Sequence, residues 1–480
     1  MSNNKEQPNI LLIIMDDVRQ DHFSCYGYKR KTTPFIDSLA DESIIFDNAY
    51  TTGPWSPPSH ASIFSGLYPS EHGVQHGHLW LDIEIPTLAE KLTDVGYETI
   101  SLSNNAFVGP ETGLDRGFSR FDEIWKRYHL GEAGFSRAGW RRTLRGFRRF
   151  FAINNKGAEF TNEVLINWLQ NERDTDKPFF VFINYLDTHP ICNSPRSFMK
   201  MFPEVRYSYF RMFKLIRAWT NKAAFASGKI KFSEKMWEFH KWLYDVAILY
   251  LDSKIRELYE VMKEIKILDD TIIIITGDHG ENFGEHGLIT HESSIYEESL
   301  RVPLIVRYPR LPSDLRIDNP VQLMDLYYLI LSQAGIKSLE SGREGRFLDM
   351  EKVINGEKSV RPVFVEYARP PGLVEKLEKM CPGYNYSRFD RGYQTIIVHP
   401  YKYIKSSKGD EELYNLSKDP KELDNLVMKD TENLERMRKR FDDFASKLVR
   451  KGQAEEPQDK GLTKEEEDEI KSRLKEMGYI

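Results

Sequence analysis

Ile10-Leu-Leu-Ile-Ile-Met-Asp-Asp17 lies near the start of the 480-residue chain and joins six apolar residues to two adjacent aspartates. Similar short apolar runs recur along the chain, separated by segments with helical periodicity. The runs that predict buried strands are Ile10–Met15, Thr99–Leu102, Phe179–Leu186, Thr271–Thr276, Leu304–Val306 and Val363–Glu366. The helical segments are Thr33–Ser43, Thr87–Val95, Gly157–Asn171 and Tyr244–Ile265. This alternation predicts an α/β fold with a large, mostly parallel sheet flanked by helices.

Near residue 391 the pattern of the sequence changes from alternating apolar runs and helical segments to short runs joined by turns. Three short runs there, Tyr393–Val398, Tyr401–Lys405 and Glu412–Tyr414, predict strands joined by tight turns, followed by a helix near 431–450. A polar, proline-containing stretch then precedes a charged segment that begins with a capping box at Thr463. We therefore expect a large α/β domain over residues 1–390, a small antiparallel α+β subdomain over 391–450, and a linker with a charged terminal helix over 451–480.

Composition narrows the classes of protein. The net charge of −6 is modest for this length and gives no reason to expect a nucleic acid as a partner. The three cysteines, Cys25, Cys192 and Cys381, form no metal-binding pair and no disulfide framework, which fits a reducing compartment. The first apolar run is too short for a signal peptide, and no run is long enough to span a bilayer. We expect a cytoplasmic protein without an integral membrane segment.

Polar residues follow three of the predicted strands. Asp16 and Asp17 follow the first, Asp187 and His189 follow another, and Asp278-His279 follows the most apolar strand of the chain. The carboxyl ends of parallel strands line the ligand crevice of such sheets, so we expect these side chains to lie close together. Adjacent acids in a crevice are costly unless a cation neutralises them. Taken alone, the aspartate pair is equally consistent with a turn.

A second candidate segment is Gly53-Pro-Trp-Ser-Pro-Pro-Ser-His-Ala-Ser-Ile-Phe-Ser-Gly66. Its two adjacent prolines predict a rigid turn, and Ser59–Phe64 can open a helix whose free N–H groups would hold an anion beside Ser56. A serine hydroxyl becomes a nucleophile only when a metal or a base activates it. Without such partners, the segment is a plain turn with a capping serine. His189 and His291 are candidates to contact an anionic substrate or to protonate a leaving group.

Several motifs in the same order resemble the sulfatase family of the alkaline-phosphatase superfamily, over roughly residues 8 to 430. Pro8–Asp17 is similar to the opening strand of that family, and Ser56–Gly66 is similar to its nucleophile segment. Asp278–Glu281 and Glu285–Leu304 resemble the second signature region, and Glu412–Leu426 resembles the closing segment. The chain is identified as an atypical member with serine at the nucleophile position.

The resemblance implies a site and a cofactor. Asp16, Asp17, Ser56, Asp278 and His279 would hold one divalent cation, with calcium expected first and manganese or magnesium as alternatives. Ser56 falls where the family carries a residue that a maturase oxidises to formylglycine, and His60, His189 and His291 fall near substrate-contacting positions. His60 stands where sulfatases have arginine, and Ser101–Asn105 replaces a Gly-Lys-Trp-His segment.

Three functions follow from this pattern. The first is metal-dependent hydrolysis of a small anionic sulfate ester through Ser56 or its formylglycine form. The second is hydrolysis of a phosphate mono- or diester, or of a phosphonate monoester, by the Ser56 alkoxide, which a second metal held by Asp187, His189 and His291 would strengthen. The third is anion binding without turnover. A basic, aromatic segment over residues 137–151 suggests either a lid or membrane contact, or a solvated helix face packed on the core, and we favour the latter.

Overall fold

The computed structural model describes residues 7–126, 157–192, 194–291, 293–336, 349–358 and 361–449. The basic segment 137–151 and the expected terminal helix over 451–480 lie outside the described residues. Within the described residues, no helix combines the length and the apolar character that crossing a membrane requires.

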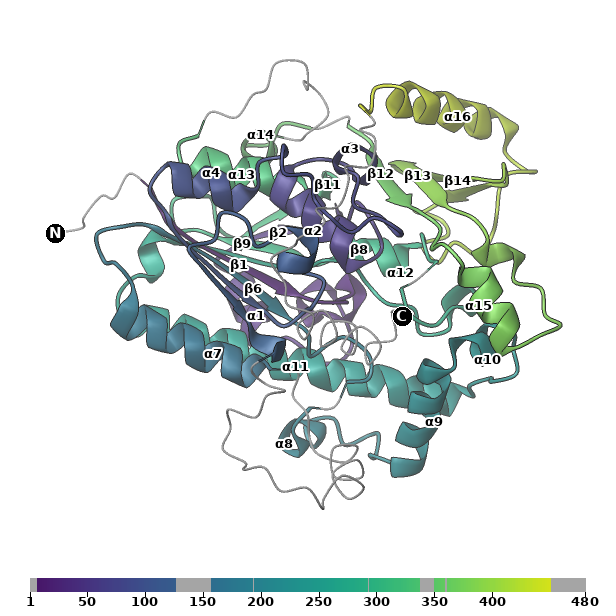
Figure 1. Cartoon of the computed structure of the whole chain (residues 1–480), viewed down its shortest axis with the longest axis horizontal. Coiled ribbons are helices and arrows are strands. Elements are labelled where there is room, and N and C mark those ends of the chain that lie inside the picture. Colours follow the sequence, from purple (N-terminus) through teal and green to yellow (C-terminus); the bar gives the residue numbers. More distant parts are fainter. Residues whose placement is uncertain are drawn as a thin grey trace.

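An eight-stranded mixed sheet forms the centre of the described structure (Figure 1). Strands β7, β1, β6, β4 and β5 are parallel to one another, and β9 runs antiparallel between β7 and β2. The order across the sheet is β10 (Leu315–Ile317), β2 (Ile44–Phe46), β9 (Leu304–Arg307), β7 (Thr271–Gly277), β1 (Asn9–Met15), β6 (Phe179–Tyr185), β4 (Glu98–Ser103) and β5 (Arg120–Glu123). The predicted α/β fold with a mostly parallel sheet is confirmed.

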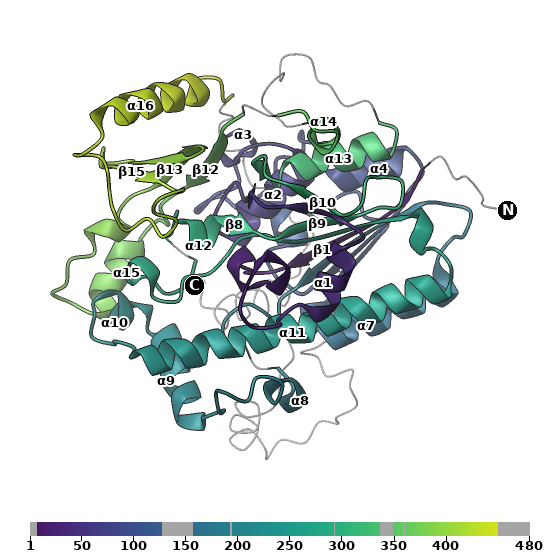
Figure 2. The same cartoon turned by 180° about the vertical axis from the view of Figure 1, so that it is seen from behind.

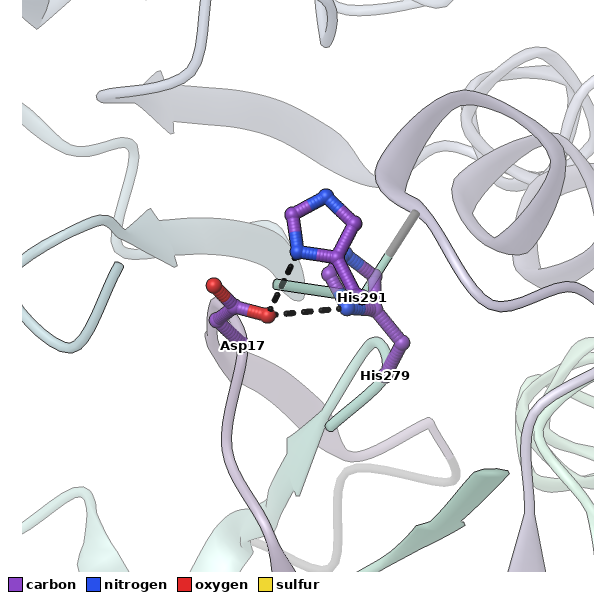
Figure 3. Close-up of side chains that lie close together, drawn as sticks. All are labelled: Asp17, His279 and His291. Carbon is purple, nitrogen blue, oxygen red and sulfur yellow. Dashed lines mark ion pairs between the residues drawn. The ribbon is translucent and has the colours of Figure 1, made fainter. Parts of the chain in front are cut away.

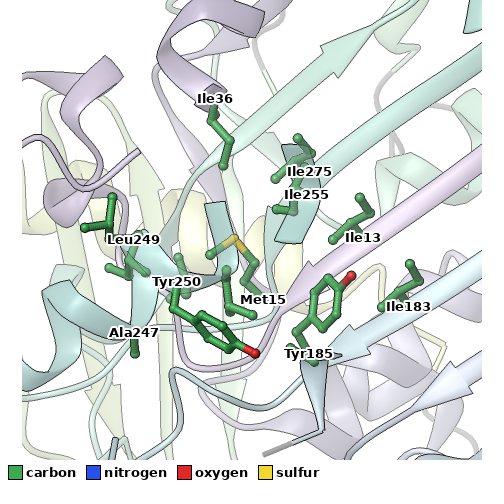
Figure 4. Packing of buried hydrophobic residues seen from close by; sticks show 14 of the residues in the cluster. Ile13, Met15, Ile36, Ile183, Tyr185, Ala247, Leu249, Tyr250, Ile255 and Ile275 are labelled. Atoms are coloured by element: carbon green, nitrogen blue, oxygen red, sulfur yellow. The ribbon is translucent and has the colours of Figure 1, made fainter. Parts of the chain in front are cut away.

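Helices cover both faces of this sheet, and Figure 2 shows the two layers from behind. One face packs on α1 (Pro34–Ala40), α7 (Ala158–Asn167) and α11 (Glu234–Glu264), and the other on α2 (Ser56–Ser65), α4 (Leu88–Asp94) and α13 (Asp325–Gln333). Successive side chains of a strand point to opposite faces. Ile13 and Met15 of β1 therefore join the first layer, where Figure 4 shows them beside Tyr185 and Ile275, and Ile14 joins the second. Burial on both faces explains why β1 is apolar throughout.

A separate four-stranded antiparallel sheet lies toward the C-terminus and carries α16 (Thr431–Ala445) on one face (Figure 1). Its strands are β12 (Val363–Tyr367), β13 (Tyr393–Val398), β14 (Tyr401–Ser406) and β15 (Glu411–Asn415). The antiparallel sheet therefore takes its first strand from the segment before residue 391. Lys402 of β14 is fully buried, and its ammonium group lies 3.1 Å from Glu297 Oε1 and 2.8 Å from Glu422 Oε1.

Smaller elements complete the described fold. A three-stranded sheet consists of β11 (Val321–Gln322), β3 (Ala49–Tyr50) and β8 (Arg301–Val302). The shorter or peripheral helices are α3 (Pro69–His72), α8 (Arg196–Met199), α9 (Tyr209–Thr220), α10 (Lys222–Ala226), α12 (Glu297–Leu300), α14 (Met350–Ile354) and α15 (Leu373–Met380). Helix α12 follows the loop that carries His291, so the Lys402 contact with Glu297 links that loop to the C-terminal sheet.

Candidate functional site

Strand pairing brings the predicted acids together. Met15 of β1 lies opposite Gly277 of β7, so Asp16 and Asp17 leave the sheet beside Asp278 and His279. The Asp17 backbone N–H donates a hydrogen bond to Asp278 Oδ1 at 3.0 Å, and the Asp16 N–H donates to the carbonyl of Tyr185 in β6 at 2.8 Å. The four side chains are fully buried. The parallel register of β1 and β7 therefore builds the centre of the site.

Helix α2 delivers Ser56 to this centre but begins earlier than expected. The helix starts at Ser56 itself, with Pro57 and Pro58 in its first turn, where a missing N–H costs little. The prolines supply no N–H, and the Ser59 N–H is directed at the carbonyl of Trp55 at 3.4 Å. The expected row of free N–H groups beside Ser56 is therefore wrong. Instead, the Ser59 hydroxyl donates to the carbonyl of Asp278 at 2.8 Å and ties the helix to β7.

The first cluster of candidate metal ligands contains Asp16, Asp278 and His279, whose ligand atoms lie within 4.8 Å of one another. His279 Nε2 lies 3.4 Å from Asp278 Oδ2 and 3.3 Å from Ser56 Oγ. Two carboxylate oxygens, Asp16 Oδ1 and Asp278 Oδ2, are buried and have no hydrogen-bond partner among the described residues. Buried carboxylates normally have a partner or coordinate a metal. The donor set therefore fits a divalent cation, and Ser56 Oγ lies 3.3 Å from His279 Nε2 at its edge.

A second cluster contains Asp17, His279 and His291 (Figure 3). Asp17 Oδ1 lies 3.1 Å from Nδ1 of each histidine, and Glu281 Oε2 lies 3.6 Å from His291 Nδ1. Asp17 has a left-handed backbone with φ of 65°, a conformation that is uncommon for residues other than glycine. The sequence analysis placed His291 with Asp187 and His189 as a possible second-metal set, whereas here His291 lies with Asp17 and His279. Among the described residues, the metal-type clusters include neither Asp187 nor His189.

Burial and mutual repulsion shift the pKa values in the site. Burial, reinforced by the charge of Asp278, raises the pKa of Asp16 to about 7, and burial with the charge of Asp17 raises the pKa of Glu281 to about 8. Burial opposes protonation of His279, but Asp278 and Asp17 outweigh it and raise the pKa of His279 to about 9. Carboxylates that keep protons near neutral pH are typical of a site that exchanges those protons for a cation.

Two asparagine amides that the sequence analysis did not assign complete the first cluster. Asn105 Nδ2 donates to Asp16 Oδ2 at 2.8 Å and to Ser56 Oγ at 3.1 Å. Asn184 Nδ2 donates to the same Asp16 oxygen at 3.2 Å and lies 3.2 Å from His60 Nε2. In the sequence, only their positions could have indicated a role in the site, because Asn105 follows β4 and Asn184 lies at the end of β6. Both strands lie on the same side of β1.

His60 is held as a neutral ring. Its Nδ1 lies 2.9 Å from the carbonyl of Ser56, which can only accept, so Nδ1 carries the proton and Nε2 accepts from Asn184. Burial lowers the pKa of His60, which agrees with this assignment. The residue that replaces the family arginine therefore supports Ser56 and adds no positive charge to the site.

His189 lies at the edge of the second cluster. Its ring centroid is 5.9 Å from that of His291 and 5.6 Å from that of Trp219 in α9, and its Nδ1 lies 2.9 Å from the carbonyl of Pro190. This contact assigns the proton to Nδ1, so Nε2 is the nitrogen suited to exchange a proton with a substrate. The sequence-predicted histidines thus lie in one neighbourhood.

An α/β fold with buried aspartates, histidines and a serine at the carboxyl ends of its parallel strands defines a hydrolase of the alkaline-phosphatase-like class. The sequence profile of the sulfatase family matches residues 8–336, and that of the C-terminal region of N-sulphoglucosamine sulphohydrolase matches residues 284–448. The chain belongs to the sulfatase family. It is a hydrolase that acts on ester bonds, which argues against anion binding without turnover.

Named relatives agree with this family. The chain is 25% identical to the choline-sulfatase of Rhizobium meliloti over 456 residues, covering 88% of this chain and 82% of the relative. It is also 25% identical to the arylsulfatase of Clostridium perfringens over 492 residues, covering 92% and 94%. Among solved structures, the phosphonate monoester hydrolase of Agrobacterium radiobacter superposes with a TM-score of 0.71 at 21% identity, covering 92% of this chain and 96% of the other.

Proposed function

We propose that the chain hydrolyses a small anionic sulfate ester at the first cluster, with Ser56 or its formylglycine form as the nucleophile. The observation that carries this proposal is the position of Ser56 Oγ, 3.3 Å from His279 Nε2 and at hydrogen-bond distance from Asn105, in a buried cluster of carboxylates. A bound divalent cation would supply Lewis-acid polarisation of the ester and would lower the pKa of a neighbouring hydroxyl. The oxygen-rich donor set favours calcium, with manganese or magnesium as alternatives.

The residues of the chain have distinct roles in this proposal. Asp16, Asp17, Ser56, Asp278 and His279 would hold the cation. The Asn105 amide orients Ser56 Oγ and favours its deprotonated form by donating a hydrogen bond to it. His60 is a positioning residue that supports the carbonyl of Ser56. When its ring is doubly protonated, His189 is the candidate to protonate the leaving alcohol through Nε2. His291 supports Asp17, because its Nδ1 lies 3.1 Å from Asp17 Oδ1.

The second candidate is hydrolysis of a phosphate or phosphonate ester by the unmodified Ser56 alkoxide. The histidine at position 60 favours this second candidate. A maturase that oxidises Ser56 would have to accept His60 in place of the family arginine. In addition, no arginine or lysine of the described residues forms an ion pair with Asp16, Asp17, Asp278 or Glu281. Burial opposes protonation of His291, but Asp17 and Glu281 raise its pKa well above the ordinary value, so His291 is a cationic group of the site.

Two measurements test the proposal. The peptide that contains Ser56 is weighed by mass spectrometry, because conversion of serine to formylglycine removes two hydrogens. Purified protein is assayed with aryl sulfate, aryl phosphate mono- and diester, and aryl phosphonate in defined calcium, manganese or magnesium. Sulfate turnover that Ser56→Ala and Asp278→Asn abolish supports the proposal. Turnover of phosphate or phosphonate alone, with an unmodified Ser56, replaces it with the second candidate.

We also propose that the protein is cytoplasmic, as the sequence predicts. Cys25, Cys192 and Cys381 are all free thiols, and Cys192 and Cys381 are buried. Free thiols are compatible with the reducing cytoplasm expected from the sequence. Labelling of the unfolded protein by a thiol reagent, with and without prior reduction, would test whether all three thiols persist in the cell.

A further inference from the structure

Helix α9 is anchored on the protein by one of its faces. Ser208 caps its N-terminus by accepting a hydrogen bond from the Arg211 N–H at 3.3 Å. Met212 and Leu215 are buried and belong to the core layer that contains α11. Figures 1 and 2 both show α9 at the periphery, below one end of α11. The burial of Met212 and Leu215 fixes which face of α9 points into the protein.

The opposite face of α9 carries three aromatic side chains. Tyr209 is 50% exposed, Phe210 66% and Phe213 53%. At about 100° per residue, these three and the exposed Lys214 and Arg217 occupy one continuous arc of about 140° around the helix axis. Single exposed apolar residues are normal on a protein surface, but aromatic side chains gathered on one helical arc mark an interaction surface. We call these five residues the aromatic arc.

The segment that contains the aromatic arc is strongly basic. Residues 196–217 include six basic residues and only one acid, in a chain whose net charge is −6. That acid, Glu204, already pairs with Arg30 at 2.7 Å. Arg206 and Lys214 form no ion pair with any described acid. The segment therefore presents uncompensated positive charge, and a partner with negative charge would complement it.

The cations and the aromatic rings form one surface. Lys214 Nζ lies 4.5 Å from the centre of the Phe210 ring, one helical turn away. Arg196, at the start of α8, donates a hydrogen bond to the Tyr209 hydroxyl at 2.6 Å. These contacts place a positive group beside two of the three exposed rings. A ligand that covers the rings would therefore meet the cations at the same time.

This combination of groups discriminates between possible occupants. A second copy of the chain, docked by the same face, would set two basic surfaces against each other, and such like-charge contacts are costly. An anionic lipid surface satisfies both kinds of group. Aromatic rings are stable at the boundary between head groups and acyl chains, and lysine and arginine are attracted to anionic head groups.

We propose that the aromatic arc docks the protein on an anionic lipid surface, with Phe210 and Phe213 at the boundary of the acyl chains and Lys214 at the head groups. This inference is independent of the reaction proposed at the first cluster. Trp219, on the buried side of the same helix, has its ring centroid 5.6 Å from that of His189. A docked protein would therefore hold the edge of its site one helix away from the lipid.

The test is sedimentation of the full-length protein with lipid vesicles. One set of vesicles is phosphatidylcholine alone, and the other is an equal mixture of phosphatidylcholine and phosphatidylglycerol. We expect the wild type to sediment with the mixed vesicles and to remain in solution with the neutral ones. Raising the salt from about 0.1 M to about 1 M, which shortens the Debye length from about 10 Å to about 3 Å, should release much of the bound protein.

Matched variants assign the binding to the aromatic arc. Replacing both Phe210 and Phe213 by serine should raise the lipid concentration needed for half-maximal binding at least about tenfold. Lys214→Ser should raise it roughly fivefold. The controls carry the same changes on the C-terminal part of the chain, at Leu423, which is 75% exposed, and at Lys429, whose side chain is 60% exposed. Leu423→Ser and Lys429→Ser are expected to bind like the wild type.

Each outcome supports or overturns the proposal. Absence of binding, equal binding to both kinds of vesicle, or full binding by the double serine variant would overturn it. Self-association that the double variant loses would assign the face to a second copy instead, and tighter binding of a single-stranded oligonucleotide than of lipid would assign it to nucleic acid. Thermal unfolding checks that each variant is folded. If the double variant is not, hydrogen exchange of the wild type decides, since slower exchange over residues 209–217 with mixed vesicles supports docking and unchanged exchange refutes it.

Discussion

Cation binding at the first cluster should weaken steeply as the pH falls. In the metal-free protein, burial and the charge of Asp278 raise the pKa of Asp16 to about 7. Burial opposes protonation of His279, but Asp278 and Asp17 raise the pKa of His279 to about 9. The cation needs the Asp16 carboxylate and the free electron pair of His279 Nε2, so a proton on either group competes with it.

The magnitude follows from the two pKa values. Between about pH 8 and about pH 6, protonation of a group with a pKa of about 7 weakens binding roughly tenfold, and a group with a pKa of about 9 weakens it roughly 90-fold. Together, Asp16 and His279 predict a rise in Kd of roughly a thousandfold. The number of protons released per ion bound should rise from about 1.0 at the higher pH to about 1.9 at the lower.

Calorimetric titration of manganese into the metal-free protein tests both quantities, because repeating it in buffers with different ionisation enthalpies counts the released protons. His279→Asn is the informative variant, since it should remove the His279 contribution and leave a weaker pH dependence that comes from Asp16. A Kd that changes less than about tenfold in the parent, or binding without proton release, would refute the view that Asp16 and His279 hold the ion.

The same shift predicts how stability depends on pH. A buried carboxyl group whose pKa is raised by folding binds its proton more tightly in the folded state than in the unfolded chain. The Asp16 contribution is therefore fully present at low pH and is lost as the pH rises from about 4 to about 7. Thermal unfolding of metal-free protein should show this loss, and added manganese should restore stability most at the alkaline end.

Three substitutions test other parts of the structure. Asn105→Ala should lower kcat/KM roughly 10- to 100-fold with little change in Tm, because it removes the amide that orients Ser56 and the first cluster, and steady-state kinetics would show it. Lys402→Met should destabilise the protein by about 3–5 kcal/mol in denaturant unfolding, because the buried Glu422 and the partly buried Glu297 lose their cation, whereas the partly exposed Lys405→Met should cost less than about 1 kcal/mol. Gly280→Ala should cost at least about 1–3 kcal/mol and reduce ion retention, because the new Cβ would lie 2.0 Å from a backbone carbonyl oxygen, and thermal unfolding with elemental analysis would measure both. An unchanged value in any of the three would contradict the contact on which it rests.

The sequence predicted the parts of the site that follow directly from buried strands. Asp16 and Asp278 could be placed because each ends an apolar run, and parallel strands bring such ends to one edge. Asn184 could not be assigned, because it reads as an ordinary strand residue until β6 is known to lie beside β1. The partner of His291 was also missed, since Asp17 and His291 lie far apart in the sequence and only the fold brings them to 3.1 Å.

The start of α2 is a second feature that the sequence did not predict correctly. Two adjacent prolines suggested a turn before a helix, but both fit within the first helical turn, where no N–H is required. The difference is only three residues along the chain. It nevertheless decides whether backbone N–H groups or the Asn105 amide contact Ser56.

The buried Lys402 contact has a consequence for the order in which the protein is made. A chain emerging from the ribosome exposes Asp16, Ser56 and Asp278 long before the residues that secure the His291 loop. Glu297, at the end of that loop, gains its buried ammonium partner only when residue 402 has been translated, and the third member of that contact, Glu422, comes later still. Because domains are synthesised from the N-terminus, a nascent or prematurely terminated chain would carry the acids without the anchored loop. The complete centre can therefore assemble only after the C-terminal strands have been synthesised.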